Sequence, residues 1–112
     1  MKITSIVEDT IVTLEIEGSL SSEAKMAFDG AVNEYASGPY HCILDLARVT
    51  FIDSTAIGSI VKYYSIFRSD GRYFLIAGIN KQIYEVFNLT GINRQISIFD
   101  SPLHAKNFIL GS

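Results

Sequence analysis

Patterns typical of strands and of helices alternate along almost the whole chain, and this order limits the possible folds more than any other feature. Apolar and polar residues alternate over residues 12–17, as in a strand with one buried face and one wet face. With residues 3–7 and the polar turn at residues 8–10, this alternation predicts an opening β-hairpin. Apolar residues at helical spacing follow from Ala24 to Tyr35, and Gly38-Pro39 ends this helix. The chain therefore begins β-β-α.

The rest of the chain repeats a strand followed by a helix three times. Short apolar runs at residues 41–46, 72–77 and 95–99 are typical of strands covered by helices. Each run precedes a segment with helical spacing, and good capping residues stand at Asn80 and Ser101. The predicted order, β-β-α-β-α-β-α-β-α, indicates an α/β domain with a mostly parallel sheet of four to five strands, an antiparallel edge strand and about four helices. The second helix is expected to bury the apolar residues at helical spacing: Ile57, Ile60, Val61, Tyr64 and Phe67.

Length and charge make several classes of function improbable. The 112 residues suit one domain spanning residues 1–112. Twelve acidic and nine basic side chains give a net charge of −3, which offers no electrostatic footprint for nucleic acid and no basic patch for anionic lipid. No window approaches the roughly 18 apolar residues of a membrane span, and acidic residues interrupt the N-terminal segment. We expect a soluble cytoplasmic protein without direct membrane insertion, and we expect the single cysteine, Cys42, to be a buried structural residue.

The segment from Val49 to Gly58 carries most of the information about function. Asp53, Ser54 and Thr55 lie where a predicted strand hands over to a helix, the usual location of functional groups in open α/β sheets. A phosphate on a hydroxyl there would meet free backbone N–H groups and the positive end of the helix dipole. The simpler interpretation is that Asp53 or Ser54 only caps the helix, and spacing alone favours that interpretation.

No familiar catalytic or cofactor-binding pattern accompanies this turn. A nucleophilic serine needs a base, yet His41 and His104 stand in no hydrolase-like context. The sequence has no glycine-rich nucleotide loop, and the paired carboxylates Glu8-Asp9 fit a turn. A phospho-accepting receiver domain would need an acidic pair after the first strand and a lysine after a late strand, where this chain has a hairpin and Asp100-Ser101. We expect no metal, no cofactor and no enzymatic activity.

The turn and its flanks form a recognisable motif. It consists of Leu44-Asp45-Leu46, Val49 and the segment from Phe51 to Gly58. Supporting segments are Gly18-Ser19-Leu20, Phe74 to Ala77 and Val86 to Gly91. Together these segments resemble the STAS family, whose founding members are bacterial anti-sigma factor antagonists and in which a similar strand leads into an Asp-Ser-Thr-Gly-Leu-Gly turn.

The resemblance implies a module that regulates transcription by binding and cycles between two forms. The unphosphorylated form would capture an anti-sigma factor that is also a serine kinase, and would thereby release a sigma factor. Phosphorylation at Ser54 would end the capture, and a metal-dependent serine phosphatase would restore it.

The resemblance also implies roles for individual residues. Ser54 aligns with the phosphoacceptor, and Thr55 offers a second, less favoured acceptor. Asp53 would orient the hydroxyl or hold the turn, Gly58 would let a partner or the neighbouring strand approach closely, and Lys62 is a candidate contact at the rim. The predicted partner-binding set is Asp53, Thr55, Ala56, Ile57, Gly58, Ser21 and Lys62.

Three features differ from the family pattern. Ala56 stands where glycine is commonest, a change that should keep the surface and stiffen the backbone slightly. Ser19 and Ser21 replace the acidic residues that the best-known antagonists carry beside the phosphosite, which affects the expected kinase contacts. The opening strand is expected to be short, so its edge could pair differently with a partner.

Two other functions are compatible with such a fold. The chain could be a STAS accessory subunit of a lipid-transporting ABC ATPase, or another binding module that needs no phosphorylation. A nucleotide-binding or weakly hydrolytic α/β domain has only fold analogy in its favour. The sequence does not decide the oligomeric state, because the six tyrosines and seven phenylalanines could all lie in the core.

Overall fold

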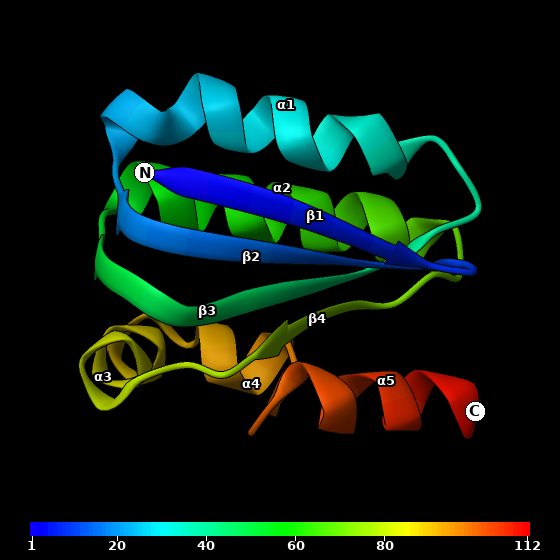
Figure 1. Ribbon diagram of the computed structural model, residues 1–112. Helices are drawn as coiled ribbons and strands as arrows, with labels where there is room; N and C mark the ends of the chain where they lie inside the picture. Colours follow the sequence, from blue (N-terminus) through cyan, green and yellow to red (C-terminus); the bar gives the residue numbers. More distant parts are fainter.

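The computed structural model describes residues 1–112 as one five-stranded sheet with helices on both faces (Figure 1). The strands are β1 (Lys2–Glu8), β2 (Ile11–Leu20), β3 (His41–Ile52), β4 (Phe74–Ala77) and β5 (Ile98–Phe99). The helices are the 3₁₀ turn η1 (Ser22–Ala24), α1 (Lys25–Ala36), α2 (Ser54–Ser69), α3 (Lys81–Thr90), α4 (Ile92–Gln95) and α5 (Pro102–Leu110). The predicted order is confirmed, with η1 and α4 as additional short elements.

The sheet has the predicted topology. Its strands lie side by side in chain order, from β1 to β5. β1 pairs with β2 antiparallel, and every other neighbouring pair is parallel. The antiparallel edge strand is therefore β1, which has only one neighbour in the sheet.

The helices divide unequally between the two faces of the sheet. Buried side chains of α1, α2, α3 and α4 join one core cluster of 23 residues, which also contains Val12, Leu14 and Leu44 of the strands. α5 packs on the other face, where Ala105 and Ile109 meet a small cluster that includes Ile43. The alternation predicted for residues 12–17 thus sends one set of side chains into the large core.

The buried face of α2 is rotated from the one that the sequence predicts. Of the five expected side chains, only Ile60 and Phe67 are buried. The other three are half-buried: Ile57, Val61 and Tyr64. Tyr63 is fully buried instead. Its ring centroid lies 6.2 Å from that of Phe28, and its hydroxyl donates to the Asp29 carbonyl at 3.5 Å. Packing against α1 therefore decides which face of α2 turns inward.

The predicted strand at residues 95–99 is much shorter in the structure, where β5 comprises only two residues. Gly91 has φ +82°, a left-handed conformation that commonly follows the end of a helix, and this conformation lets the chain turn at once into α4. Ile92 and Ile96 are buried at the two ends of that helical turn. Their burial holds Gln95 in α4 rather than in the strand.

Three other strands differ from the prediction in length. β3 continues beyond residue 46 to Ile52. The opening strand is not short, since β1 has seven residues and pairs with β2 along its whole length. β4 begins at Phe74 because Arg72 is engaged elsewhere: its guanidinium donates to the carbonyls of Tyr35 at 3.2 Å and Tyr40 at 2.9 Å.

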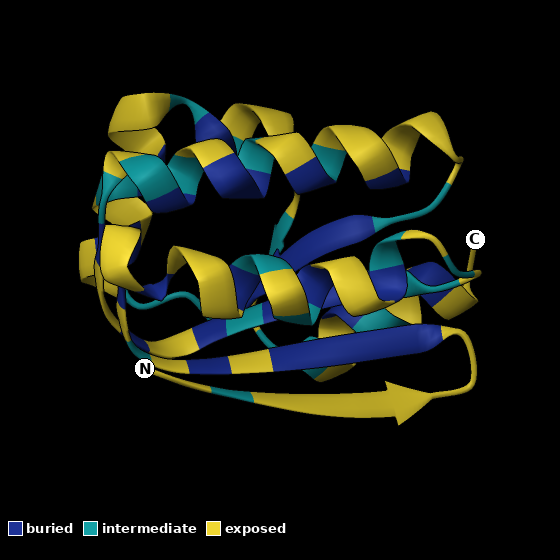
Figure 2. Ribbon diagram, turned by 90° about the horizontal axis from the view of Figure 1, so that it is seen from above, coloured by how far each residue is buried: buried dark blue, intermediate teal, exposed yellow.

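Buried residues follow the sheet and the inner faces of the helices, whereas β1 is exposed along most of its length (Figure 2). Cys42 is fully buried as predicted, and burial raises the pKa of its thiol well above the ordinary value. None of the helices combines the length and the apolar character needed to cross a membrane.

Candidate functional site

The candidate site lies at the edge of the sheet where β2 and β3 both end, on the left side of Figure 1. The parallel register pairs Leu20 with Ile52, so the residues that follow each strand leave the sheet together. η1 starts at Ser22 and α2 starts at Ser54. Two helical elements that are far apart in the sequence therefore begin side by side.

The Asp53 side chain links the first residues of η1 and α2. Its Oδ1 accepts a hydrogen bond from the Ala56 N–H at 3.0 Å and caps α2, as the simpler interpretation of the sequence predicts. Its Oδ2 accepts from the Ser22 N–H at 2.8 Å. The Asp53 N–H in turn donates to the Leu20 carbonyl at 3.4 Å. One side chain thus fixes the start of α2 and the exit of β2 relative to each other.

These hydrogen bonds favour the ionised form of Asp53. The bond from the Ala56 N–H is the main cause that lowers the pKa of the carboxyl below its ordinary value. Desolvation, the next largest effect, opposes this shift, and the bond from the Ser22 N–H adds to the lowering. The turn therefore carries a fixed negative charge at neutral pH.

Ser54 occupies the first position of α2 and is exposed. Asp53 rather than Ser54 provides the cap, so the Ser54 hydroxyl is not needed to satisfy the end of the helix. A phosphoryl group on it would lie at the positive end of the helix dipole. The position combines access for another protein with a favourable place for added negative charge.

The three residues after Ser54 are all less exposed than Ser54. Thr55 and Ile57 are half-buried, whereas Ala56 is only 4% exposed. Ala56 faces the interior, so a partner on the surface does not meet its methyl group. The Thr55 side chain is therefore less accessible than that of Ser54.

Gly58 and Lys62 lie on the exposed side of α2, four and eight residues after Ser54. A Cβ added to Gly58 would have no heavy atom within 4 Å, so no strand approaches this glycine and that part of the prediction is wrong. The surface above Gly58 is open. Lys62 places its Nζ 5.2 Å from the centroid of the Tyr63 ring.

Ser21 lies beside the turn, directly before η1, and is half-buried. Its backbone carbonyl accepts from the Ala24 N–H at 2.9 Å, and its side chain makes no capping hydrogen bond. The bond from the Ser22 N–H to Asp53 therefore places Ser21 next to the start of α2.

Asn80 supports the end of β3 from the opposite side. β4 pairs only with the first part of β3, from Cys42 to Asp45, so the last residues of β3 extend beyond it. Asn80 Nδ2 donates to the Val49 carbonyl at 2.7 Å, and Asn80 Oδ1 accepts from the Ile83 N–H at 3.0 Å. The residue that caps α3 thereby also holds the strand that leads to Ser54.

The sequence does not reveal three features at or near this edge. The Ser22 N–H donates to Asp53, and the Asn80 side chain, besides capping α3 as predicted, donates to the Val49 carbonyl; each bond joins residues 31 positions apart, which no local pattern indicates. Phe51 is 51% exposed although it lies in a strand, two residues before Asp53. The sequence gives no sign of this exposure, because Phe51 stands beside Ile52 in an apolar context typical of a buried strand.

The sequence matches the family model described as the STAS domain over residues 2–105. This match covers most of the chain, so the protein belongs to the STAS domain family. A relative in Paenibacillus polymyxa, named anti-sigma F factor antagonist, is 22% identical over 91 residues, which are 81% of this chain and 76% of that protein.

Two solved structures have the same fold. A candidate anti-sigma factor antagonist of Thermotoga maritima matches with a TM-score of 0.87 and 26% identity, over 94% of this chain and 92% of that one. The unphosphorylated form of the anti-sigma factor antagonist SpoIIAA matches with a TM-score of 0.79 and 15% identity, over 99% and 100% of the two chains. The sheet with its antiparallel edge strand and surrounding helices is thus shared with these proteins.

Proposed function

We propose that this protein is an anti-sigma factor antagonist that acts by binding and is switched off by phosphorylation at Ser54. The observation that carries the proposal is the exposed hydroxyl of Ser54 at the first position of α2, on a turn held by Asp53. The names of the relatives in Paenibacillus polymyxa and Thermotoga maritima support the same role. The site of action of such a protein is the cytoplasm, where sigma factors meet RNA polymerase.

The surface of the turn suits reversible binding. Ser54, Gly58 and Lys62 follow one another on the exposed side of α2, and Ser21 lies directly before Ser22, whose N–H donates to Asp53. The unphosphorylated surface would bind an anti-sigma factor that is also a serine kinase, and a serine phosphatase would restore it. Binding requires no reaction by the chain itself, so the proposed role is not enzymatic.

A phosphoryl group would change this surface without unfolding it. It adds about −1.5 to −2 charges at neutral pH beside the ionised Asp53. The N-terminus of α2 stabilises part of this charge, so the helix stays formed. A partner that packs on the uncharged serine would then face a concentrated negative charge and would have to desolvate it.

Intact mass spectrometry tests the phosphorylation step. Incubation of the wild type with ATP and each anti-sigma factor kinase of the source cell should add one phosphate with one of the kinases. Ser54→Ala should abolish the gain and Thr55→Ala should keep it, since Thr55 is half-buried. A Ser54→Ala variant that is still phosphorylated by that kinase contradicts the proposed acceptor.

Binding of the same kinase to charge variants tests the switch. Ser54→Asp should weaken binding by roughly tenfold or more, because about 1.4 kcal/mol of unfavourable interaction changes a dissociation constant tenfold. Ser65→Asp is the matched control, since Ser65 is another exposed serine of α2, eleven residues further along. Equal loss of affinity in both variants would contradict a site centred on Ser54.

A further inference from the structure

β1 leaves one edge of the sheet without a partner. Six of its seven residues are exposed, and Ile3 is the exception. The exposed fraction is 38% for Ile6 and 47% for Val7. No helix extends over the outer side of the strand, which forms the outermost part of the molecule in Figure 2. A strand of this length measures roughly 23 Å and is long enough to template pairing with another strand.

The backbone groups that face this open edge follow from the hydrogen bonds of β2. The Thr10 carbonyl accepts from the His41 N–H at 2.7 Å, so the even-numbered residues of this strand direct their backbone groups toward β3. The odd-numbered residues of β2 face β1, and their partners in β1 are even-numbered, such as Glu8 opposite Ile11. The free N–H and C=O groups of the edge therefore belong to Ile3, Ser5 and Val7.

The residues of β1 are complementary to themselves when the strand is reversed about Ser5. In that arrangement Lys2 faces Glu8 of a second copy, Ile3 faces Val7, Thr4 faces Ile6, and Ser5 faces Ser5. Each pair joins two odd or two even positions, so the paired side chains share a face of the sheet. The three odd positions that carry the free backbone groups come directly opposite one another.

We propose that β1 pairs antiparallel with β1 of a second copy of this chain, in the register centred on Ser5, to form one continuous ten-stranded sheet. The pairing supplies two hydrogen bonds at the central Ser5 pair and two at each Ile3–Val7 pair. It places opposite charges at both ends of the shared edge and covers part of the exposed apolar surface of Ile6 and Val7.

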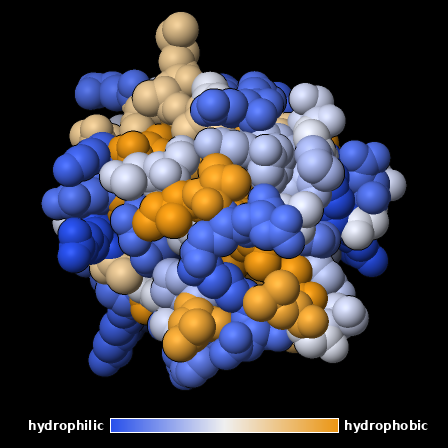
Figure 3. All heavy atoms as spheres, turned by 45° about the vertical axis from the view of Figure 1, so that its right-hand side comes forward, coloured by the Kyte–Doolittle hydropathy of each residue, from blue (hydrophilic) through white to orange (hydrophobic).

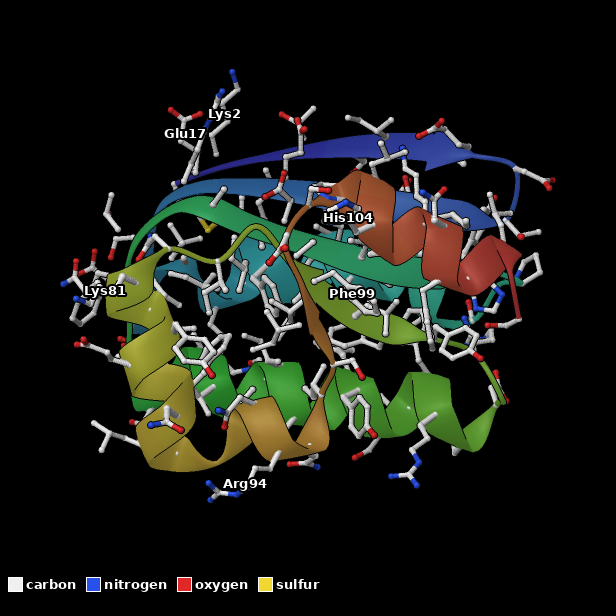
Figure 4. All side chains as sticks on the ribbon, turned by 90° about the horizontal axis from the view of Figure 1, so that it is seen from below. Lys2, Glu17, Lys81, Arg94, Phe99 and His104 are labelled. Carbon is white, nitrogen blue, oxygen red and sulfur yellow. The ribbon has the colours of Figure 1, made fainter.

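The charged ends of β1 are available for these contacts. Lys2 projects from the sheet beside Glu17, the residue opposite it in β2 (Figure 4). Glu8 pairs with Lys106 of α5, yet its side chain remains 56% exposed. Both side chains are on the even-numbered face of β1, where the two strands of the dimer would bring them together.

Apolar surface alone does not specify the partner. On the face that contains the hairpin turn, apolar side chains form separate groups among polar ones (Figure 3). The specificity comes from the self-complementary charges and from the row of free backbone groups.

The arrangement has a consequence for the proposed function, although the pairing itself does not depend on it. The two β1 strands run in opposite directions, so the two Ser54 sites lie at opposite ends of the joined sheet. Neither site is covered, and the dimer could bind two partner molecules at once.

Sedimentation equilibrium of the full chain tests the pairing. The wild type should associate to a dimer within protein concentrations up to about 1 mM. Ser5→Pro removes an N–H that the monomer does not use, and edge strands tolerate proline. It should raise the dimer dissociation constant about 25-fold, because two hydrogen bonds are lost per dimer and each contributes roughly fivefold.

Ser5→Ala is the matched control, because it keeps the N–H and should dimerise like the wild type. Circular dichroism should show that both variants are folded. A wild type that stays monomeric over the whole concentration range overturns the proposal, and so does a folded Ser5→Pro variant that dimerises as tightly as Ser5→Ala.

Charge reversal tests the register without proline. Lys2→Glu alone and Glu8→Lys alone should each weaken the dimer, since each brings like charges together at both ends of the edge. The double variant restores opposite charges and should regain most of the affinity. A double variant weaker than both single variants would exclude the register centred on Ser5.

Discussion

At the scale of single residues, Asp53 has two functions that the sequence shows only in part. Its position before a helix predicts the cap, and the bond from Ala56 confirms it. Its second bond, to Ser22, joins segments 31 residues apart and depends on the register of β2 and β3. Asp53, which directly precedes the exposed Ser54, therefore accepts a hydrogen bond at each of its two carboxylate oxygens.

The lowered pKa of Asp53 predicts a pH-dependent loss of stability. The carboxyl of the unfolded chain titrates near 3.9, so its contribution is present above that pH and is lost as the pH falls through the lower folded value. Asp53→Asn should be less stable than the wild type at pH 7, and the difference should shrink below about pH 4. Urea unfolding at both pH values measures it. A difference that is constant with pH would contradict the assigned hydrogen bonds.

His41 should also make the stability depend on pH, in a higher pH range than Asp53. Its Nδ1 accepts from the Tyr73 N–H at 2.9 Å, and burial followed by the charge of Arg72 lowers the pKa of the imidazole. The unfolded chain takes up its proton first, near pH 6.5, so stability should fall as the pH drops from there toward the folded value. His41→Asn can keep the acceptor but cannot titrate. Its unfolding free energy should therefore change less between pH 7.5 and pH 5.5, which denaturant titrations can measure.

At the scale of elements, the end of β3 is the part that the site depends on most. β4 stops pairing with β3 at Asp45, and from there β3 is held by β2 on one side and by Asn80 on the other. At the point where pairing with β4 ends, Asp45 Oδ1 accepts a hydrogen bond from the Ala47 N–H at 3.1 Å. Beyond the end of β4, the Asn80 side chain thus takes the place of a neighbouring strand and holds the part of β3 that leads to Ser54.

Asn80→Ala should destabilise the protein by about 2 kcal/mol, because it removes a helix cap and leaves the Val49 carbonyl without its donor. Asn80→Asp separates the two effects, since it keeps the acceptor that caps α3 and loses only the donor. Urea unfolding should rank the variants with Asn80→Asp between the wild type and Asn80→Ala. An Asn80→Ala variant as stable as the wild type would show that the contact with β3 is dispensable.

At the scale of the whole molecule, the order of elements and the mixed sheet could be predicted because each long element has a clear period. Helix caps at Asn80 and Ser101 were predictable for the same local reason. α4 could not be predicted, since its four residues are held by burial of Ile92 and not by a pattern. The inward position of Tyr63 likewise depends on α1, which a single helical segment does not reveal.

The large core should dominate the stability of the whole fold. Leu44 lies in the middle of the sheet and is fully buried, so Leu44→Ala should cost about 2–5 kcal/mol. Phe51→Ala, at a half-exposed ring of the same strand, should cost much less. Thermal or denaturant unfolding compares the two variants. Equal costs would mean that the ring of Phe51 is packed in solution.

The central claim is that phosphorylation at Ser54 controls partner binding. The most direct measurement is the affinity of the cognate anti-sigma factor for the unmodified protein and for the same protein phosphorylated at Ser54, by titration calorimetry. The unmodified form should bind tightly, and phosphorylation should lower the affinity by roughly tenfold or more. Equal affinity for the two forms would contradict it.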